Sequence, residues 1–239
     1  MKGSFQLITI TLLRFFILCI LSCSYQPELN FTTLINQAEE NGISLENSNS
    51  TIIVNPKEET EDALIFYPGG YVTYESYLPL MIKCAERGIK CFLLQMPSDL
   101  AILDITAANG IIETNPEISN WYIGGHSLGG AMSAFYMSQY SENFKGLILL
   151  AAYSTHKLSD KKLKVLSIYG ENDQVLKMNN FLKYKSNLPL KNLEEHVISG
   201  GNHGNFGSYG FQKGDGKATI SADEQQEITA DYIRNFIKN

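Results

Sequence analysis

From residue 51 onward, the chain alternates between short apolar runs and longer amphipathic stretches. The apolar runs predict strands at 51–54, 63–67, 90–94, 121–124, 146–151, 164–169 and 195–198. Apolar positions at helical spacing predict helices at 77–87, 100–113, 128–140, 178–186 and 222–237. The run at 146–151 is apolar almost throughout, which is typical of a parallel strand covered on both faces.

This alternation predicts an α/β fold with a doubly wound, mostly parallel sheet, helices on both faces and right-handed crossovers. Residues 51–239 contain no internal repeat and no low-complexity linker, so we expect one domain there. Ligands of such sheets bind at the carboxyl ends of the strands. Reactive side chains that follow a predicted strand are therefore the candidates for chemistry.

The first 22 residues predict an export signal. Lys2 and Arg14 supply positive charge, and residues 15–21 are wholly apolar. The sequence Ile20-Leu21-Ser22-Cys23 resembles a bacterial lipobox, which implies cleavage before Cys23 and lipidation of its thiol.

Two other interpretations of the N-terminus stay open. Residues 5–23 could just span a bilayer as an uncleaved signal anchor, or the signal could be removed for simple secretion. All three interpretations imply export, and we expect a lipoprotein of the cell envelope. Residues 23–50 are mostly polar and predict a tether with one short helix at 31–40.

Composition narrows the function further. Apolar residues make up 44% of the chain, enough for a sizeable core. The 25 acidic residues outnumber the 19 basic ones, which argues against nucleic acid as a partner. Four cysteines match neither a disulfide scaffold nor a zinc pattern. Cys84 and Cys91 are either two buried thiols or a small-loop disulfide.

Gly125-His126-Ser127-Leu128-Gly129 fits the pattern G-x-S-x-G between a predicted strand and a predicted helix. In that context the motif forms a nucleophile elbow, a strained turn that holds a serine hydroxyl at the N-terminus of the helix. Its neighbours must be small because backbone segments approach closely. Ser127 is the candidate nucleophile.

A serine hydroxyl needs a base to take its proton. His126, His156 and His196 sit where a structural or surface histidine is the simpler interpretation. His203 differs, because it follows the last predicted strand in the loop 200–204, after the serine and near the C-terminus. We expect His203 to be the general base.

The carboxylate that orients this base should follow an intermediate strand. Asp173 follows the strand at 164–169, with a turn before it and a helix after it, and Glu171 is the alternative. Asp173 could also serve only as a helix N-cap. The chain order Ser127, Asp173, His203 is the one found when a nucleophile elbow carries the triad.

An oxyanion hole needs two backbone N–H donors. One is expected from Leu128, the residue after the nucleophile. The other is expected from Gly70 or Tyr71, in the loop that follows the strand at 63–67.

Taken together, these motifs resemble the α/β-hydrolases, and in particular the small, capless branch related to dienelactone hydrolase. The resemblance covers roughly residues 50–239 and rests on 67–103, the serine elbow and the histidine loop at 199–221. It implies the α/β-hydrolase fold without a cap domain and the triad Ser127, Asp173 and His203. Asp215, in a Gly-Asp-Gly turn shared with that branch, is interpreted as structural.

The chain departs from that branch at several positions. Dienelactone hydrolase itself uses a cysteine nucleophile, so its activity is not carried over to Ser127. Tyr71 stands where related chains often have lysine, and Ser208 and Phe211 are atypical in the histidine loop. These differences concern the pocket, and therefore the substrate.

We therefore predict a serine hydrolase that cleaves a small carboxylic ester or similar acyl bond through an acyl-enzyme, without a metal or organic cofactor. Only residues 153–163 separate two predicted strands where related folds carry a lid, so the site should be open to short or surface-presented esters. The alternatives are a non-catalytic binding lipoprotein and an acyltransferase. The membrane is the expected partner of the N-terminus.

Overall fold

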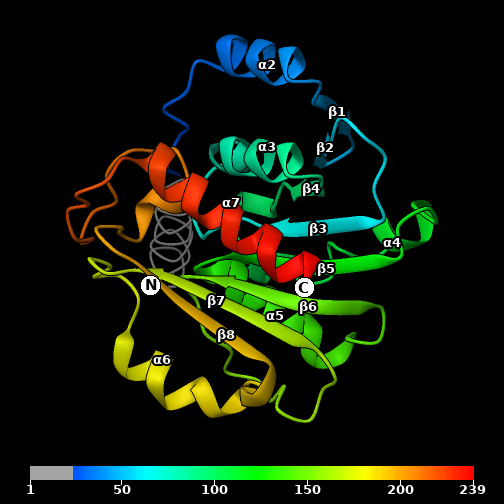
Figure 1. Ribbon diagram of the computed structural model, residues 1–239. Helices are drawn as coiled ribbons and strands as arrows, with labels where there is room; N and C mark the ends of the chain where they lie inside the picture. The colour runs from blue at the N-terminus through cyan, green and yellow to red at the C-terminus, as the bar shows by residue number, and fades with distance from the viewer. Residues whose placement is uncertain (1–23) are drawn as a thin grey trace, which may run out of the picture.

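The computed structural model describes residues 24–239, arranged as one twisted eight-stranded sheet with helices on both faces (Figure 1). The strand order is β1-β2-β4-β3-β5-β6-β7-β8. Strands β3 to β8 are parallel, whereas β1 and β2 are antiparallel additions at one edge. The predicted signal and the lipidation site at Cys23 lie outside the described residues.

The seven predicted strands are all present, with ends that differ by a few residues. They are β2 (Thr51–Asn55), β3 (Asp62–Tyr67), β4 (Lys90–Leu94), β5 (Asn120–His126), β6 (Phe144–Leu150), β7 (Lys164–Gly170) and β8 (Leu193–Ile198). Every residue of β3 is buried, because helices cover both faces of the sheet there.

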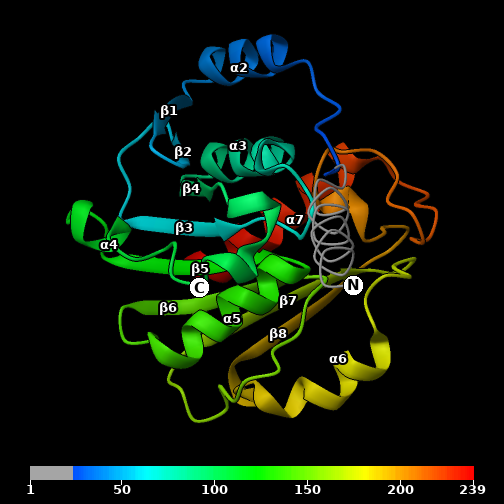
Figure 2. The ribbon, with the colours of Figure 1, turned by 180° about the vertical axis from the view of Figure 1, so that it is seen from behind.

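Helices form a layer on each side of the sheet (Figures 1 and 2). On one side α3 (Leu78–Glu86) packs beside α7 (Ala222–Lys238), and their apolar residues share one core cluster. On the other side α5 (Leu128–Gln139) packs on β5 and β6 over a second cluster. The short helix α6 (Met178–Tyr184) follows β7. Residues 151–163, between β6 and β7, contain no helix or strand, so no cap covers the sheet there.

The predicted helix at 100–113 is wrong. That stretch contains only a 3-10 turn, Ala101–Leu103, a run of turns and the single-turn helix α4 (Ile111–Thr114). The Tyr67 hydroxyl donates to the Ile105 carbonyl at 2.7 Å and accepts the Ala108 N–H at 3.1 Å. These bonds replace helical ones, and Gly110, at φ 82°, breaks the helical path before α4.

The segment expected to be a tether is largely folded. The predicted helix at 31–40 is present as α2 (Phe31–Glu40) and packs by Ala38 on the core beside α3. In addition, β1 (Ser44–Ser48) pairs with β2, so the sheet begins earlier than residue 51. The apolar pattern missed β1 because it is an exposed edge strand, held by backbone hydrogen bonds rather than by burial.

Candidate active site

Ser127 occupies a strained turn between β5 and α5. Its φ of 51° and ψ of −117° are rarely adopted by a residue with a side chain, and they mark the sharp strand-to-helix turn that the motif predicts. The Ser127 N–H donates to the Leu150 carbonyl at 2.9 Å, which ties the turn to the end of β6. The serine is therefore held at the carboxyl edge of the sheet, at the start of α5.

Two glycines make this turn sterically feasible. A Cβ on Gly125 would lie 2.5 Å from the Tyr67 carbonyl oxygen, and one on Gly129 would collide with the carbonyl oxygens of Tyr67 and Pro68. The elbow thus presses directly against the end of β3, where only a bare backbone fits. This contact also brings the loop after β3 next to Leu128.

Asp173 and His203 form a buried pair. His203 Nδ1 lies 2.8 Å from Asp173 Oδ2, and both side chains are about 1% exposed. The other carboxylate oxygen, Oδ1, accepts the N–H groups of Val175 and Leu176 at 2.8 Å each. Asp173 is therefore both a cap of the turn and a fixed partner of the histidine, so the two interpretations of this residue hold together.

His203 lines the same hollow as the serine. His203 and Ser127 line one common hollow of about 260 Å³, with Leu128, Ala151, Val175 and Leu176 among its other walls. His203 Nε2 is buried and has no hydrogen-bond partner within the described chain. Because Nδ1 is turned to Asp173, Nε2 is the nitrogen that remains to accept a proton on the serine side.

Glu171 and Asp215 have structural positions. Glu171 is turned toward the end of β8, where its Oε2 accepts from Ser199 Oγ and the Gly200 N–H at 2.9 Å each. These bonds lower the pKa of the Glu171 carboxyl. Asp215 accepts the N–H of Gly204 at 2.9 Å through Oδ2 and that of Gln174 at 3.3 Å through Oδ1. It thereby joins the loop after His203 to the loop after Asp173.

Of the backbone donors expected near Ser127, Gly70 and Leu128 are available and Tyr71 is not. The Tyr71 N–H donates to the Asp99 carbonyl at 2.8 Å. Within the described chain the Gly70 N–H makes no hydrogen bond, and the Leu128 N–H belongs to the first turn of α5, where amides lack intrahelical acceptors. A Cβ on Gly70 would lie 2.9 Å from Leu128 Cδ2, so the Gly70 backbone packs against the Leu128 side chain.

Sequence reasoning missed Tyr77, which lies behind the site. Its hydroxyl accepts the Gly69 N–H at 3.1 Å and lies 2.8 Å from His126 Nδ1. Burial raises the pKa of the Tyr77 phenol, so the hydroxyl stays protonated and can donate a hydrogen bond to His126 Nδ1. No local motif marks this role, because the partner in β5 lies far along the chain.

His126 is buried, as a structural histidine should be. Its ring centroid lies 4.5 Å from that of His203, and burial, with the nearby His203, holds its pKa well below the ordinary value. His156 stacks on Phe135 and His196 stacks on Tyr232, both away from Ser127. Only His203 pairs with a buried carboxylate, which agrees with its assignment as the base.

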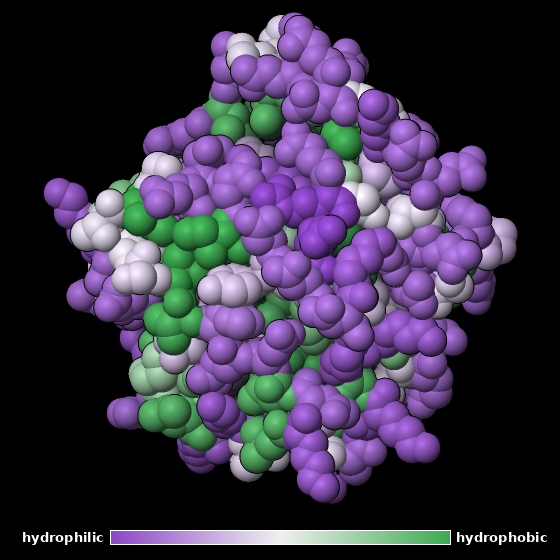
Figure 3. Space-filling model, viewed as in Figure 1, coloured by the Kyte–Doolittle hydropathy of each residue, from purple (hydrophilic) through white to green (hydrophobic). Residues whose placement is uncertain are grey.

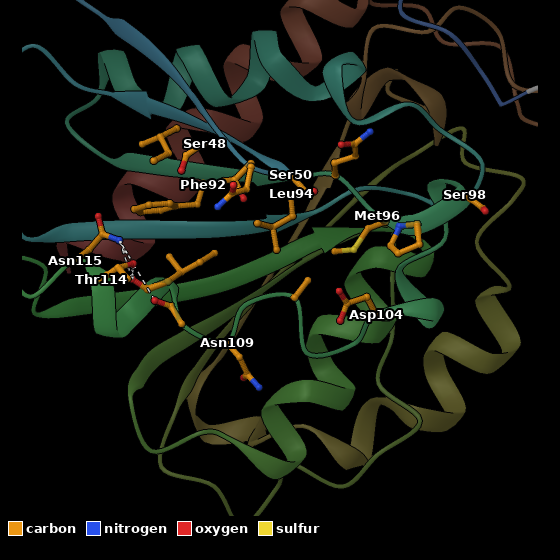
Figure 4. Close-up of a pocket in the computed structure, with 18 residues that line it drawn as sticks. Ser48, Ser50, Phe92, Leu94, Met96, Ser98, Asp104, Asn109, Thr114 and Asn115 are labelled. Atoms are coloured by element: carbon orange, nitrogen blue, oxygen red, sulfur yellow. Dashed lines mark hydrogen bonds between the residues drawn. The ribbon is translucent and has the colours of Figure 1, made fainter.

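A larger hollow than the one at Ser127 lies elsewhere. It measures about 670 Å³ and opens between the β2–β4 edge of the sheet and the segment 96–115 (Figure 4). Of its lining residues only Asp104 is ionisable, and the rest include Ser48, Phe92, Met96 and Asn115. It shares no residue with the Ser127 hollow and holds no nucleophile beside a base, so its size does not make it the better candidate.

Cys84 and Cys91 are buried free thiols, not a disulfide. Residues 24–239 contain no group of three or more His, Cys, Asp or Glu side chains arranged to hold a metal ion. Within that range, no helix is both long and apolar enough to cross a membrane.

Comparisons with solved structures show the fold. The chain is similar to the Francisella virulence factor BioJ, with 17% identity over 87% of this chain and 90% of that one and a TM-score of 0.63. Est1E from Butyrivibrio proteoclasticus gives 14% identity over 83% of this chain and all of that one, with a TM-score of 0.58. A bacterial membrane phospholipase A gives 13% identity, coverage of 100% and 98%, and a TM-score of 0.60.

Sequence comparisons give the family. A search of curated proteins found no match. The model of the alpha/beta hydrolase family, in contrast, matches residues 63–227, well over half of the chain and the part that holds β3, the serine elbow and the acid–base pair. This protein therefore belongs to the alpha/beta hydrolase family.

Proposed function

We propose that this protein is a serine hydrolase that cleaves carboxylic esters through an acyl-enzyme. The observation that carries the proposal is the convergence on one hollow of a serine in a strained elbow and a histidine paired to a buried carboxylate. Neither feature alone is diagnostic, because glycine-rich turns and buried ion pairs also occur without chemistry. Their meeting at the carboxyl edge of the sheet supports a nucleophile with its base.

In the proposed first step, Ser127 Oγ attacks the ester carbonyl carbon and its proton passes to His203 Nε2. The carbonyl electron pair moves onto oxygen, and this oxyanion accepts hydrogen bonds from the Leu128 and Gly70 N–H groups. As the intermediate collapses, the bond to the alcohol breaks and His203 protonates the departing oxygen. Asp173 keeps the imidazole in the correct tautomer and stabilises its charged form.

In the second step, water attacks the acyl-enzyme while His203 removes its proton, and the same two N–H groups hold the second oxyanion. Release of the acid restores the Ser127 hydroxyl. The hollow is small and open, with Ala152, Val175 and Leu176 among its walls, and no cap encloses it. These features favour short acyl groups, or esters presented at a surface.

Fluorophosphonate labelling and a panel of p-nitrophenyl esters test this proposal. The purified protein should be labelled at Ser127 and should hydrolyse at least one short ester, and Ser127→Ala should lose both. Ser138→Ala is the matched control on the same helix, because the Ser138 hydroxyl bonds only to the Phe135 carbonyl within the described chain. Absence of labelling in the wild type would favour a non-catalytic binding protein, and ester products formed with an added alcohol would favour an acyltransferase.

Three finer assignments belong to the same proposal. We place the protein in the capless branch related to dienelactone hydrolase, supported by the short β6–β7 connection. We also propose export, with lipidation at Cys23 after removal of residues 1–22. Incorporation of a clickable palmitate into the wild type but not into Cys23→Ala would support the lipoprotein. A signal anchor or a secreted form would take no label.

A further inference from the structure

The N-terminal strap, defined as residues 24–28, is built into the rim of the candidate active site. Tyr25 forms a parallel bridge with residues 68–73, the loop after β3 that we call the oxyanion loop. Its N–H donates to the Tyr71 carbonyl at 2.8 Å, and its carbonyl accepts the Thr73 N–H at 3.0 Å. On its other side the strap reaches the histidine loop. The Tyr25 hydroxyl accepts the Lys213 N–H at 3.0 Å, and the Glu28 N–H donates to the Ser208 carbonyl at 2.8 Å.

This attachment fixes where the chain enters the domain. An extended residue spans about 3.5 Å, so the two steps from Tyr25 back to Cys23 cover at most about 7 Å. The predicted signal or anchor, residues 5–23, carries a single charge, Arg14, and joins the described chain next to this attachment. Lipid on Cys23 or an uncleaved anchor would in either case attach the chain to the membrane at the edge of the sheet that carries the candidate site.

Exposed apolar side chains also lie in the segments that follow the carboxyl ends of the strands, the edge that carries Ser127. Among residues 24–239, nine large hydrophobic residues are exposed, and six of them follow the carboxyl ends of β3, β4, β7 and β8: Tyr71, Ile102, Leu103, Met178, Leu182 and Phe211. Phe211 is 65% exposed and Leu103 is 59% exposed. In Figure 3, hydrophobic side chains gather toward the left, the side on which Figure 1 places the loop after β8. We call these six residues the apolar rim.

We propose that the apolar rim is a docking face for a phospholipid bilayer, so that the active site opens onto the membrane surface. The occupant is a bilayer because the predicted signal or anchor joins the described chain next to this rim. The substrate class that follows is an ester whose acyl chain lies in that membrane. This substrate rests on the proposed hydrolase function, whereas the docking itself does not.

Docking of this kind depends on insertion of apolar side chains rather than on attraction of charge. The chain has 25 acidic and 19 basic residues, so it offers no overall attraction to anionic lipid. Aromatic side chains such as Tyr71 and Phe211 suit the interfacial layer, where an apolar ring meets hydrated head groups. We therefore expect docking to be similar on zwitterionic and on anionic vesicles.

Quenching by brominated lipid tests the docking geometry. The single native tryptophan, Trp121, is buried near the start of β5, so Phe211→Trp adds one reporter on the rim. Tyr140→Trp is the matched control, an exposed aromatic position at the end of α5, about 20 Å away at the opposite edge of the sheet. The full-length chain is reconstituted in dibromo-phosphatidylcholine vesicles.

The added emission of Phe211→Trp should fall at least about twofold, because interfacial side chains sink to the head-group and acyl boundary, whereas that of Tyr140→Trp should not change. Equal quenching at both positions, or none at position 211, would overturn the proposal. An unquenched reporter would favour coverage of the rim by a second copy or by residues 5–23. If the proposal is correct, the same quenching should be seen when Ser127→Ala is added to each reporter variant, because docking does not require turnover.

A kinetic experiment tests the substrate class. Phe211→Ser combined with Leu103→Ser should slow hydrolysis of a long-chain ester in phosphatidylcholine vesicles about tenfold, through lost apolar contact, and should spare a water-soluble p-nitrophenyl ester. Tyr140→Ser combined with Leu190→Ser, at the other edge, should change neither rate. A rim variant that slows both esters equally, or neither, would contradict the proposal. A wild type that hydrolyses neither ester while quenching persists would instead refute the hydrolase function.

Discussion

The two edges of the parallel sheet carry different chemistry, although both are hollowed. At the amino edge, a hollow of about 610 Å³ is lined by residues 55–61 together with Lys90, Glu117 and Ile118. It contains one partly exposed ion pair, Lys90 with Glu117 at 3.0 Å. At the carboxyl edge, the Ser127 hollow is smaller, but the hydrogen-bonded pair of Asp173 and His203 beside it is almost fully buried.

Backbone strain separates the edges in the same way. The described chain contains six non-glycine residues with positive φ: Asn49, Tyr71, Ser98, Asp99, Ser127 and Ala151. All six lie at the carboxyl edge, in loops that follow parallel strands or, for Asn49, in the β1–β2 turn beside the end of β4. Strain of this kind persists only where the surroundings enforce it, and it concentrates at functional sites. Burial of charge and strain, rather than volume, therefore identify the candidate site.

The largest expected effect comes from the acid at the carboxyl edge. Asp173→Asn should lower kcat for a short ester about 10⁴-fold, because an amide at this position favours the wrong imidazole tautomer. Glu171→Gln is the matched control two residues away and should change kcat little, since Glu171 contacts Ser199 and Gly200 rather than His203. A large loss in Glu171→Gln with little loss in Asp173→Asn would reverse the assignment of the acid.

The second largest effect is expected at Tyr77, which lies behind the candidate site at the carboxyl edge. Tyr77→Phe leaves the Gly69 N–H and His126 Nδ1 without their partner, so it should lower the free energy of unfolding by about 2 kcal/mol. It should also reduce kcat/KM, because Gly69 precedes the proposed oxyanion donor. Urea unfolding and ester kinetics measure the two effects. Tyr122→Phe, whose hydroxyl bonds to Ile237 near the amino edge, should leave kcat/KM unchanged.

The buried His126 predicts a pH dependence of stability. Its folded pKa lies below its unfolded value, so below about pH 6.5 the unfolded chain binds a proton that the folded chain does not. The free energy of unfolding should therefore fall as the pH drops from 6.5, by up to about 1.4 kcal/mol per pH unit from this group. His126→Asn should show a shallower fall in the free energy of unfolding when urea unfolding is compared at pH 5.5 and 6.5.

The features that could be predicted from the sequence are those that depend on residues close together in the chain. The serine elbow could be predicted because strand, motif and helix adjoin along the chain, and His203 followed because the chain order of the fold places it after the last strand. The seven predicted strands are likewise present, since each carries its own apolar run.

Features that depend on distant contacts were not predictable. The helix expected at 100–113 is broken by the Tyr67 hydroxyl, which lies 38 residues before Ile105. The choice between Gly70 and Tyr71 depends on the Asp99 carbonyl, which belongs to another loop. Edge strand β1 gains its hydrogen bonds from β2 without an apolar pattern of its own. The pattern of apolar and polar residues does not indicate such pairings, because each joins segments that meet only in the folded chain.

The smallest expected effect comes from a substitution at the amino edge. Glu117→Gln removes one half of the Lys90 ion pair, where its own backbone N–H and Lys90 lower the pKa of the carboxyl. Because the Glu117 side chain is 54% exposed, water screens the pair, and the free energy of unfolding should change by less than about 1 kcal/mol. Ester hydrolysis should not change at all. If Glu117→Gln instead lowered kcat with an unchanged free energy of unfolding, the larger hollow at the amino edge would take part in catalysis, and the distinction between the edges would fail.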